Sequence, residues 1–190
     1  GVSRMTARQA LQLLQQSGYT RTQVGKGTYA TRPQIDQELR ELTSFTKDMT
    51  QRGLMPRSRV LVAEVRRADA ECAANLQTET GVDLVVLQRV RLADDKPIAI
   101  ETAHLRHSQF PDLLAERDFS QDSRYLVLKE QYGVHLVWAN QVIGARMPDS
   151  AERAVLELPP RTPVLSLQRV TYDDHNQPVE FVRSSYHSER

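Results

Sequence analysis

Residues 87–101 read LQRVRLADDKPIAIE, and residues 167–181 read LQRVTYDDHNQPVEF. Each stretch begins with Leu-Gln-Arg-Val, passes through an Asp-Asp pair and a Pro, and then returns to an apolar run with a Glu. Two β-prone runs around an Asp- and Asn-rich break are typical of a β-hairpin. The chain therefore contains the same predicted hairpin twice, starting 80 residues apart.

The similarity extends upstream of both hairpins. Apolar, β-prone runs at 59–65 and 135–143 are each followed by a short Ala- and Glu-containing stretch, at 70–76 and 151–158, that is typical of a helix. This order predicts strand, helix, strand, strand, used twice. A long period that occurs only twice indicates a duplicated α+β domain rather than a solenoid. We expect the copies to pair about a pseudo-two-fold axis and to bury a shared sheet face.

Charge is distributed unevenly along the 190 residues. Residues 1–33 carry five bases and no acid, a charge of +5, whereas the remainder carries −4. A basic head on a mildly acidic body favours an anionic partner for the head, nucleic acid first. The length suits one domain with an attachment or two small domains. We place the domain boundary in the polar linker after residue 33, which gives domains 1–33 and 34–190.

Composition and motifs argue against several other classes. One cysteine, Cys72, excludes an internal disulfide framework, fits a reducing cytoplasm, and is expected to be a small packed residue. No apolar run approaches the roughly 18 residues of a membrane span, and no signal peptide opens the chain. Nucleophile-elbow, P-loop and dinucleotide motifs are absent, so no cofactor is predicted. We interpret His104 and His107 as surface polar residues rather than metal ligands, and Trp138 as core.

Residues 3–18 are typical of one helix, with Ser3 as its N-cap and Gly18 as its stop. The apolar spacing predicts a buried stripe on one face of this helix. That stripe consists of Ala7, Ala10, Leu11 and Leu14.

Polar residues occupy the other positions of the first two turns, and they suit a DNA major groove. Arginine can read guanine edges there, while hydroxyls and a helix N-terminus hold phosphate. A solvated surface helix is the plainer alternative. Residues 19–24 and 28–31 then predict a hairpin with a basic, glycine-rich tip that can contact phosphate or enter the minor groove. The candidate DNA-binding residues are Ser3, Arg4, Thr6, Arg8, Gly25, Lys26 and Gly27.

This segment resembles the recognition helix and wing of GntR-type bacterial transcription regulators, which bind DNA through a winged helix-turn-helix. The resemblance implies about two further helices ahead of this one, so we expect the chain to be part of a longer regulator. The matching residues are Ser3, Arg4, Thr6, Arg8, Ala10, Leu11, Leu14, Gly18, Gly25, Gly27, Thr28 and Tyr29.

A second predicted helix follows the linker, capped by Thr43 or Ser44 and stopped after Arg52 by Gly53. Its N-terminal amides, near Phe45 and Thr46, form a potential anion site, although a plain helix start is the commoner case.

This stretch and the duplicated body resemble UTRA, the effector domain of the HutC branch of the GntR family, whose fold is similar to that of chorismate lyase. The matching motifs are Leu42–Met49, Arg89/Arg91, Pro97/Glu101, Ser123/Tyr125 before Tyr132-Gly133, and Pro178/Glu180/Tyr186. The resemblance implies an α+β fold: a partial winged helix-turn-helix, then a duplicated antiparallel sheet.

Arg89 and Arg91 lie two apart on a predicted strand, so they share one face. Arginine forks suit phosphate or carboxylate, although a solvated strand face is an equal alternative on the residues alone. Repeat two has Thr171 in place of Arg91, so we expect one main anion site, on the side of repeat one. In similar sugar-phosphate-binding members, residues matching these arginines hold the phosphate. By that resemblance, Phe45, Thr46, Arg89, Arg91, Ser123 and Tyr125 would hold an anionic group, and Glu101, Glu180 and Tyr186 would select among ligands.

These expectations predict a cytoplasmic, homodimeric regulator, a repressor by preference. A small anion such as a sugar phosphate or carboxylate would modulate its binding to palindromic operator DNA. The rival hypothesis is a lyase-like enzyme acting on a small carboxylate, since fold alone does not set function. A third hypothesis is a module for dimerisation and ligand sensing only.

Overall fold

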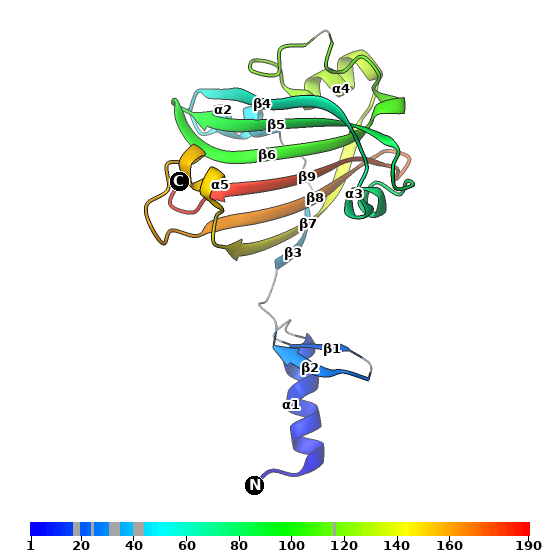
Figure 1. Ribbon diagram of the computed structural model, residues 1–190, viewed down its shortest axis with the longest axis vertical. Helices are drawn as coiled ribbons and strands as arrows, with labels where there is room; N and C mark the ends of the chain where they lie inside the picture. The colour runs from blue at the N-terminus through cyan, green and yellow to red at the C-terminus, as the bar shows by residue number, and fades with distance from the viewer. Residues whose placement is uncertain (17–19, 24, 31–34, 40–43, 116) are drawn as a thin grey trace. The chain divides into compact units, whose positions relative to one another are not determined.

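The computed structural model describes residues 1–16, 20–23, 25–30, 35–39, 44–115 and 117–190. The chain forms two compact units, Gly1–Ile35 and Asp36–Arg190. Figure 1 colours the chain from the blue N-terminus to the red C-terminus. Among the described residues, no helix is both long enough and apolar enough to cross a membrane.

The first unit contains a helix and a two-stranded hairpin. Helix α1 spans Arg4–Gln16, and strands β1 (Thr20–Gln23) and β2 (Gly27–Ala30) pair antiparallel. The Ser3 hydroxyl accepts the Thr6 amide at 3.1 Å, which confirms the predicted N-cap. The predicted helix stop at Gly18 and the hairpin ends at 19, 24 and 31 lie outside the described residues.

The predicted burial of one α1 face is wrong for this unit. Leu11 and Leu14 are 46% and 43% exposed, and Ala7 and Ala10 are exposed as well. Within the described part of the first unit, α1 packs mainly against β1, and these described residues provide no second layer to cover the stripe.

The second unit is built on a seven-stranded sheet in the order β3-β7-β8-β9-β6-β5-β4 (Figure 1). Strands β4 to β6 belong to repeat one and β7 to β9 to repeat two, so the two halves run outward from the central β9–β6 pair in opposite senses. This arrangement confirms the duplicated antiparallel sheet, and its strand order is the one expected for a pseudo-two-fold axis between β9 and β6. The strands span β3 Ile35–Leu39, β4 Pro56–Arg67, β5 Asp83–Ala93, β6 Lys96–Arg106, β7 Leu136–Arg146, β8 Val164–Asp173 and β9 Pro178–His187.

Three short helices of the second unit, α2, α3 and α5, begin at side-chain caps. The Ser44 hydroxyl accepts the Lys47 amide at the start of α2, and Asp69 and Asp149 cap α3 and α5 in the same way. Such caps satisfy helix amides that have no partner within the helix. The helices span α2 Phe45–Gln51, α3 Ala70–Asn75, η1 His107–Gln109, α4 Arg124–Tyr132 and α5 Ser150–Val155.

The central strands β5, β6 and β9 are buried on both faces of the sheet. On one face, Val85 and Leu87 pack with Val127 and Leu128 of α4. On the other face, Leu84 and Phe181 pack with α3, where Cys72 is 2% exposed, as predicted. Burying each such aliphatic or aromatic side chain contributes about 1.5–3 kcal/mol. Each repeat's helix also packs on the other repeat: α3 contacts β9, and α5 contacts β6.

Backbone geometry explains the acidic turns of the two hairpins. Asp94 and Asp95 adopt positive φ angles of 49° and 64°, a region that Asp tolerates better than most residues. In the second hairpin, an oxygen of Asp173 accepts the amides of His175 and Gln177 at 2.9 and 2.8 Å. The longer second turn is therefore closed by its own side chain.

Two further expectations are wrong. His104 is not a surface residue: β6 lies at the centre of the sheet, which buries the ring to 7% exposure, and its Nδ1 lies 3.2 Å from the Phe181 carbonyl oxygen. Trp138 is not core. It is half-buried in β7, stacks on Tyr172 with ring centroids 4.0 Å apart, and donates from its indole N–H to Asn176 at 2.9 Å.

Candidate functional site

Four arginines and two glutamates meet on the sheet face that carries α2 and α4. Five of these side chains are buried, and Arg169 is half-buried. They come from both repeats: β5 and β6 supply three, β8 and β9 supply two, and α4 supplies the sixth. We call this set the ionic cluster: Arg89, Arg91, Glu101, Arg124, Arg169 and Glu180.

Arg124 joins the carboxylates of the two repeats. Its Nη1 donates to Glu101 Oε1 at 2.8 Å, its Nε donates to Glu180 Oε2 at 2.8 Å, and its Nη2 lies 2.7 Å from the same oxygen. Arg89 Nη2 donates to Glu101 Oε1 as well, at 2.8 Å. The first turn of α4 is thereby tied to β6 and β9 at once.

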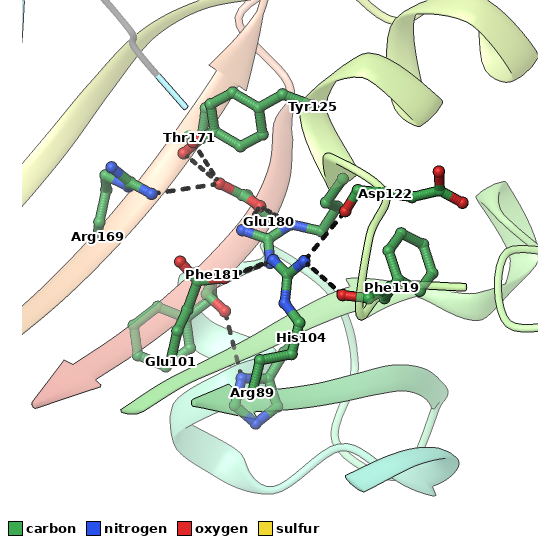
Figure 2. Close-up of polar contacts among 11 residues, drawn as sticks. Arg89, Glu101, His104, Phe119, Asp122, Tyr125, Arg169, Thr171, Glu180 and Phe181 are labelled. Carbon is green, nitrogen blue, oxygen red and sulfur yellow. Dashed lines mark hydrogen bonds and ion pairs between the residues drawn. The ribbon is translucent and has the colours of Figure 1, made fainter. Parts of the chain in front are cut away.

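Glu180 is fully enclosed, at 0% exposure, and both of its oxygens accept hydrogen bonds. Tyr125 and Thr171 donate to Oε1 at 2.8 and 2.9 Å, and Arg169 lies 3.9 Å from it (Figure 2). Glu180 therefore orients the groups around it and does not itself line the open part of the site.

Arg91 has a different environment. Its guanidinium lies over the Phe45 ring, 4.5 Å from the ring centroid. Its Nε and Nη1 are buried without a hydrogen-bond partner among the described residues, as are Arg89 Nε and Arg169 Nε. Buried donors without partners are costly, so these atoms mark where a ligand can bind.

The cluster contains two more positive than negative side chains. Burial lowers the pKa of Arg89 to about 10, and burial also lowers the pKa of Arg91. Burial alone would raise the pKa of Glu101, but Arg124, Arg89 and Arg91 outweigh it and hold that pKa well below its ordinary value. Arg89, Arg91 and Glu101 are thus charged near neutral pH, and four guanidinium groups against two carboxylates leave an excess of positive charge.

Beside the cluster lies a small cavity of about 20 Å³, which we call the arginine hollow. Ser123 is the N-cap of α4, yet its hydroxyl makes no capping bond, so it is available to a ligand. The residues that line the hollow are Ser44, Phe45, Arg89, Arg91, Glu101, Ser123, Arg124, Tyr125 and Arg169.

Most predicted site residues meet here. The solvated-face alternative for Arg89 and Arg91 does not hold, since both are buried. Thr46, Glu180 and Tyr186 are not among the lining residues; Tyr186 is half-buried, and burial raises its pKa. The hollow also takes Arg169 from repeat two, so it is not confined to the repeat-one side.

Sequence reasoning missed Arg124, Ser44 and Arg169 as lining residues. The available signal for Arg124 was its position between two predicted site residues, Ser123 and Tyr125. Arg169 is the repeat-two counterpart of Arg89, so the duplication itself could have identified it.

The predicted DNA-binding residues lie together in the first unit. Arg4 and Arg8 are exposed on α1, and the Ser3 and Thr6 hydroxyls are 2.9 Å apart at its start. Gly25 and Gly27 have positive φ angles of 76° and 109°, which only glycine adopts readily, so the tip carrying Lys26 depends on them.

The UTRA domain family matches residues 51–190. The chain belongs to the UTRA branch of the GntR family. The HTH-type transcriptional repressor NagR of Bacillus subtilis (strain 168) is 34% identical over 190 residues, which are 100% of this chain and 77% of that protein. The HTH-type transcriptional repressor PhnF of Mycolicibacterium smegmatis is 32% identical over 190 residues, covering 100% and 76%. The crystal structure of PhnF from Mycobacterium smegmatis has a TM-score of 0.74 at 29% identity and covers 100% of this chain and 82% of that chain.

This GntR-family protein is therefore a DNA-binding transcription regulator with a ligand-binding effector domain, and not an enzyme. The predicted α+β fold with a UTRA sheet is confirmed. Of the winged helix-turn-helix, the structure describes one helix and the hairpin.

Proposed function

We propose that residues 34–190 bind a small anionic effector in the arginine hollow, and that the effector changes the affinity of residues 1–33 for operator DNA. The observation that carries this proposal is the excess of two positive charges in the ionic cluster, with Arg91 stacked on a ring and two of its buried donors unpartnered among the described residues. Buried charges are normally paired, and arginine donors match phosphate and carboxylate oxygens.

Two sets of residues in the hollow would contact different parts of the ligand. Around the anionic group stand arginine donors, hydroxyls and the first residues of α2. Glu101 lines the hollow and accepts directly from hydroxyl or amine groups of the ligand. Glu180 acts through Tyr125 and Arg124, whose positions it fixes. The proposed anion-holding residues are Phe45, Thr46, Arg89, Arg91, Ser123 and Tyr125, and the proposed selecting residues are Glu101, Glu180 and Tyr186.

Charge favours a dianion. A phosphate monoester carries about −1.5 to −2 at pH 7, whereas a carboxylate carries one negative charge. The first value balances the two excess guanidinium charges, and the second leaves one uncompensated. A sugar phosphate is accordingly our first choice of effector class, with small carboxylates as the second.

For the head, we propose that Ser3, Arg4, Thr6 and Arg8 enter the major groove and that Lys26, between Gly25 and Gly27, contacts phosphate. NagR and PhnF are repressors by name, which supports the same role here. A two-fold homodimer would bind a palindromic operator, and the protein would act in the cytoplasm.

Thermal unfolding with glucose 6-phosphate, glucose and small carboxylates tests the effector proposal. A ligand at about 100 times its Kd adds roughly 2.7 kcal/mol of stability. We expect stabilisation by the sugar phosphate and none by glucose. Arg91→Ala should abolish the stabilisation without lowering the stability of the free protein, because it removes a buried cation that forms no ion pair with any described residue.

Arg59→Ala is the matched control, since Arg59 is exposed on the edge strand β4. Absence of stabilisation by every anion, or an unchanged response in Arg91→Ala, would contradict the proposed site. Affinity for DNA from upstream of the regulator's own gene, measured with and without the stabilising anion, tests the coupling.

A further inference from the structure

The aromatic ring of Phe45 contacts Arg91, the arginine of the cluster whose side chain has two nitrogens without a partner among the described residues. Phe45 is half-buried at the start of α2, and its ring centroid lies 4.5 Å from the Arg91 guanidinium carbon. A guanidinium over an aromatic face is attracted by the ring quadrupole, more so when water is excluded. The ring therefore stabilises a cation that the other arginines of the cluster repel.

Arg89 provides the internal comparison. It also lies near a ring, that of Phe119, but at 5.8 Å, and it has an ion pair with Glu101 at 2.8 Å. Arg89 is thus held by a carboxylate and would keep its place without its ring. Burial lowers the pKa of Arg91, and the attraction of Glu101 offsets this only in part. Arg91 forms no ion pair with any described residue, so it depends more on its ring contact.

The geometry leaves the donors of Arg91 free for an anion. A planar guanidinium presents its face to a ring and its N–H groups along its edge. The guanidinium carbon of Arg91 lies over the Phe45 ring, while Nε and Nη1 have no partner within the described part of the chain. Ring and anion can therefore engage the same side chain together.

The place of Phe45 in the chain gives this contact a second role. It is the first residue of α2, its N-cap Ser44 lines the hollow, and β3 precedes it in the sequence. Farther along α2, Met49 is 8% exposed and anchors the helix in the second unit. The ring thus connects the anion-binding arginine to the stretch of sequence that leads back toward residues 1–33.

We propose that Phe45 is a positioning residue for Arg91. Its ring orients the guanidinium edge of Arg91 toward the effector anion and couples anion binding to the start of α2. The inference rests on the proposed function and adds the residue through which the anion is sensed. Without the ring, Arg91 would sample other rotamers, and the entropy lost on binding an anion would rise.

Titration calorimetry with inorganic phosphate and glucose 6-phosphate tests the inference on Phe45→Leu, Phe45→Met and Phe45→Tyr. We expect the two variants without a ring to bind phosphate about tenfold more weakly, and Phe45→Tyr to stay within about twofold of the parent protein. The methionine variant keeps apolar bulk if the leucine variant does not fold. Lys47→Ala, an exposed change on the same helix, is the control and should bind normally.

NMR of the Arg91 Nε–H group supplies a readout that packing alone would not move. Its resonance is identified by its loss in Arg91→Lys. The ring current of a stacked aromatic should displace this resonance in the parent protein and in Phe45→Tyr, but not in Phe45→Met.

The outcomes separate the two proposals. If the parent protein binds neither phosphate compound, the proposed function fails. If the parent binds and the variants without a ring bind equally well, the proposed function stands and the role of Phe45 is overturned. The inference is also overturned if Phe45→Tyr loses phosphate binding and the Arg91 resonance has the same chemical shift in Phe45→Met as in the parent protein. Phe45 would then act through packing alone.

Discussion

Replacing Arg124 by Met should destabilise the second unit by about 4 kcal/mol, because breaking a buried ion pair from one side costs about 3–5 kcal/mol. The change removes both donors to Glu180 Oε2 and one donor to Glu101. Glu101 retains Arg89, so most of the loss falls on Glu180. That carboxylate would stay buried with two hydroxyl donors and one arginine 3.9 Å away.

A double-mutant cycle identifies the cause of that loss. Glu180→Gln removes the charge that Arg124→Met leaves unpaired, so the double variant should be less destabilised than the sum of the single variants by about 2 kcal/mol. Urea unfolding followed by Trp138 fluorescence measures this, since the single tryptophan lies in the second unit and stacks on Tyr172. A loss below about 1 kcal/mol for Arg124→Met, or strictly additive effects, would refute the reasoning.

Two other predictions concern the scaffold. Gly133 ends α4 with a φ of 65°, and an added Cβ would meet no other group within 4 Å. Gly133→Ala should therefore lower the free energy of unfolding by about 1 kcal/mol through backbone strain alone. Urea unfolding measures this loss, and a neutral result would contradict it. The Arg146 hydrogen bond and ion pair lower the pKa of Glu152 to about 2. The contribution of Glu152 to the free energy of unfolding is therefore complete above its ordinary pKa of 4.5 and is lost as pH falls toward 2. Glu152→Gln should flatten the stability profile over that range, and a parallel profile would argue against the linkage.

The duplicated hairpins were predictable because their signals are local. Alternating apolar residues around Asp-rich turns set the strands, and Ser44, Asp69 and Asp149 begin helices by bonding to amides three residues ahead. Such interactions depend on neighbours in sequence, so the residues themselves indicate them.

The role of Arg124 was not predictable in this way. Its partner Glu180 lies 56 residues away, and an arginine on the first turn of a helix usually faces water. Trp138 and His104 were misjudged for a related reason. Whether a strand residue is buried depends on its strand's place in the sheet, which is set by the pairing of the two repeats and not by the residue or its neighbours.

The exchange of helices between the repeats has a consequence for how this molecule could have arisen and diversified. Because α3 rests on β9 and α5 on β6, neither half is a complete globule, and either half alone would have to associate with a second copy of itself. Such an ancestral pair would carry two identical arginine sets. Fusion into one polypeptide allows each half to mutate separately. Arg91 in repeat one and its counterpart Thr171 in repeat two are an example of such a difference. In a symmetric pair of identical polypeptides, a ligand cavity on the two-fold axis must have two like ends, and fusion removes that constraint.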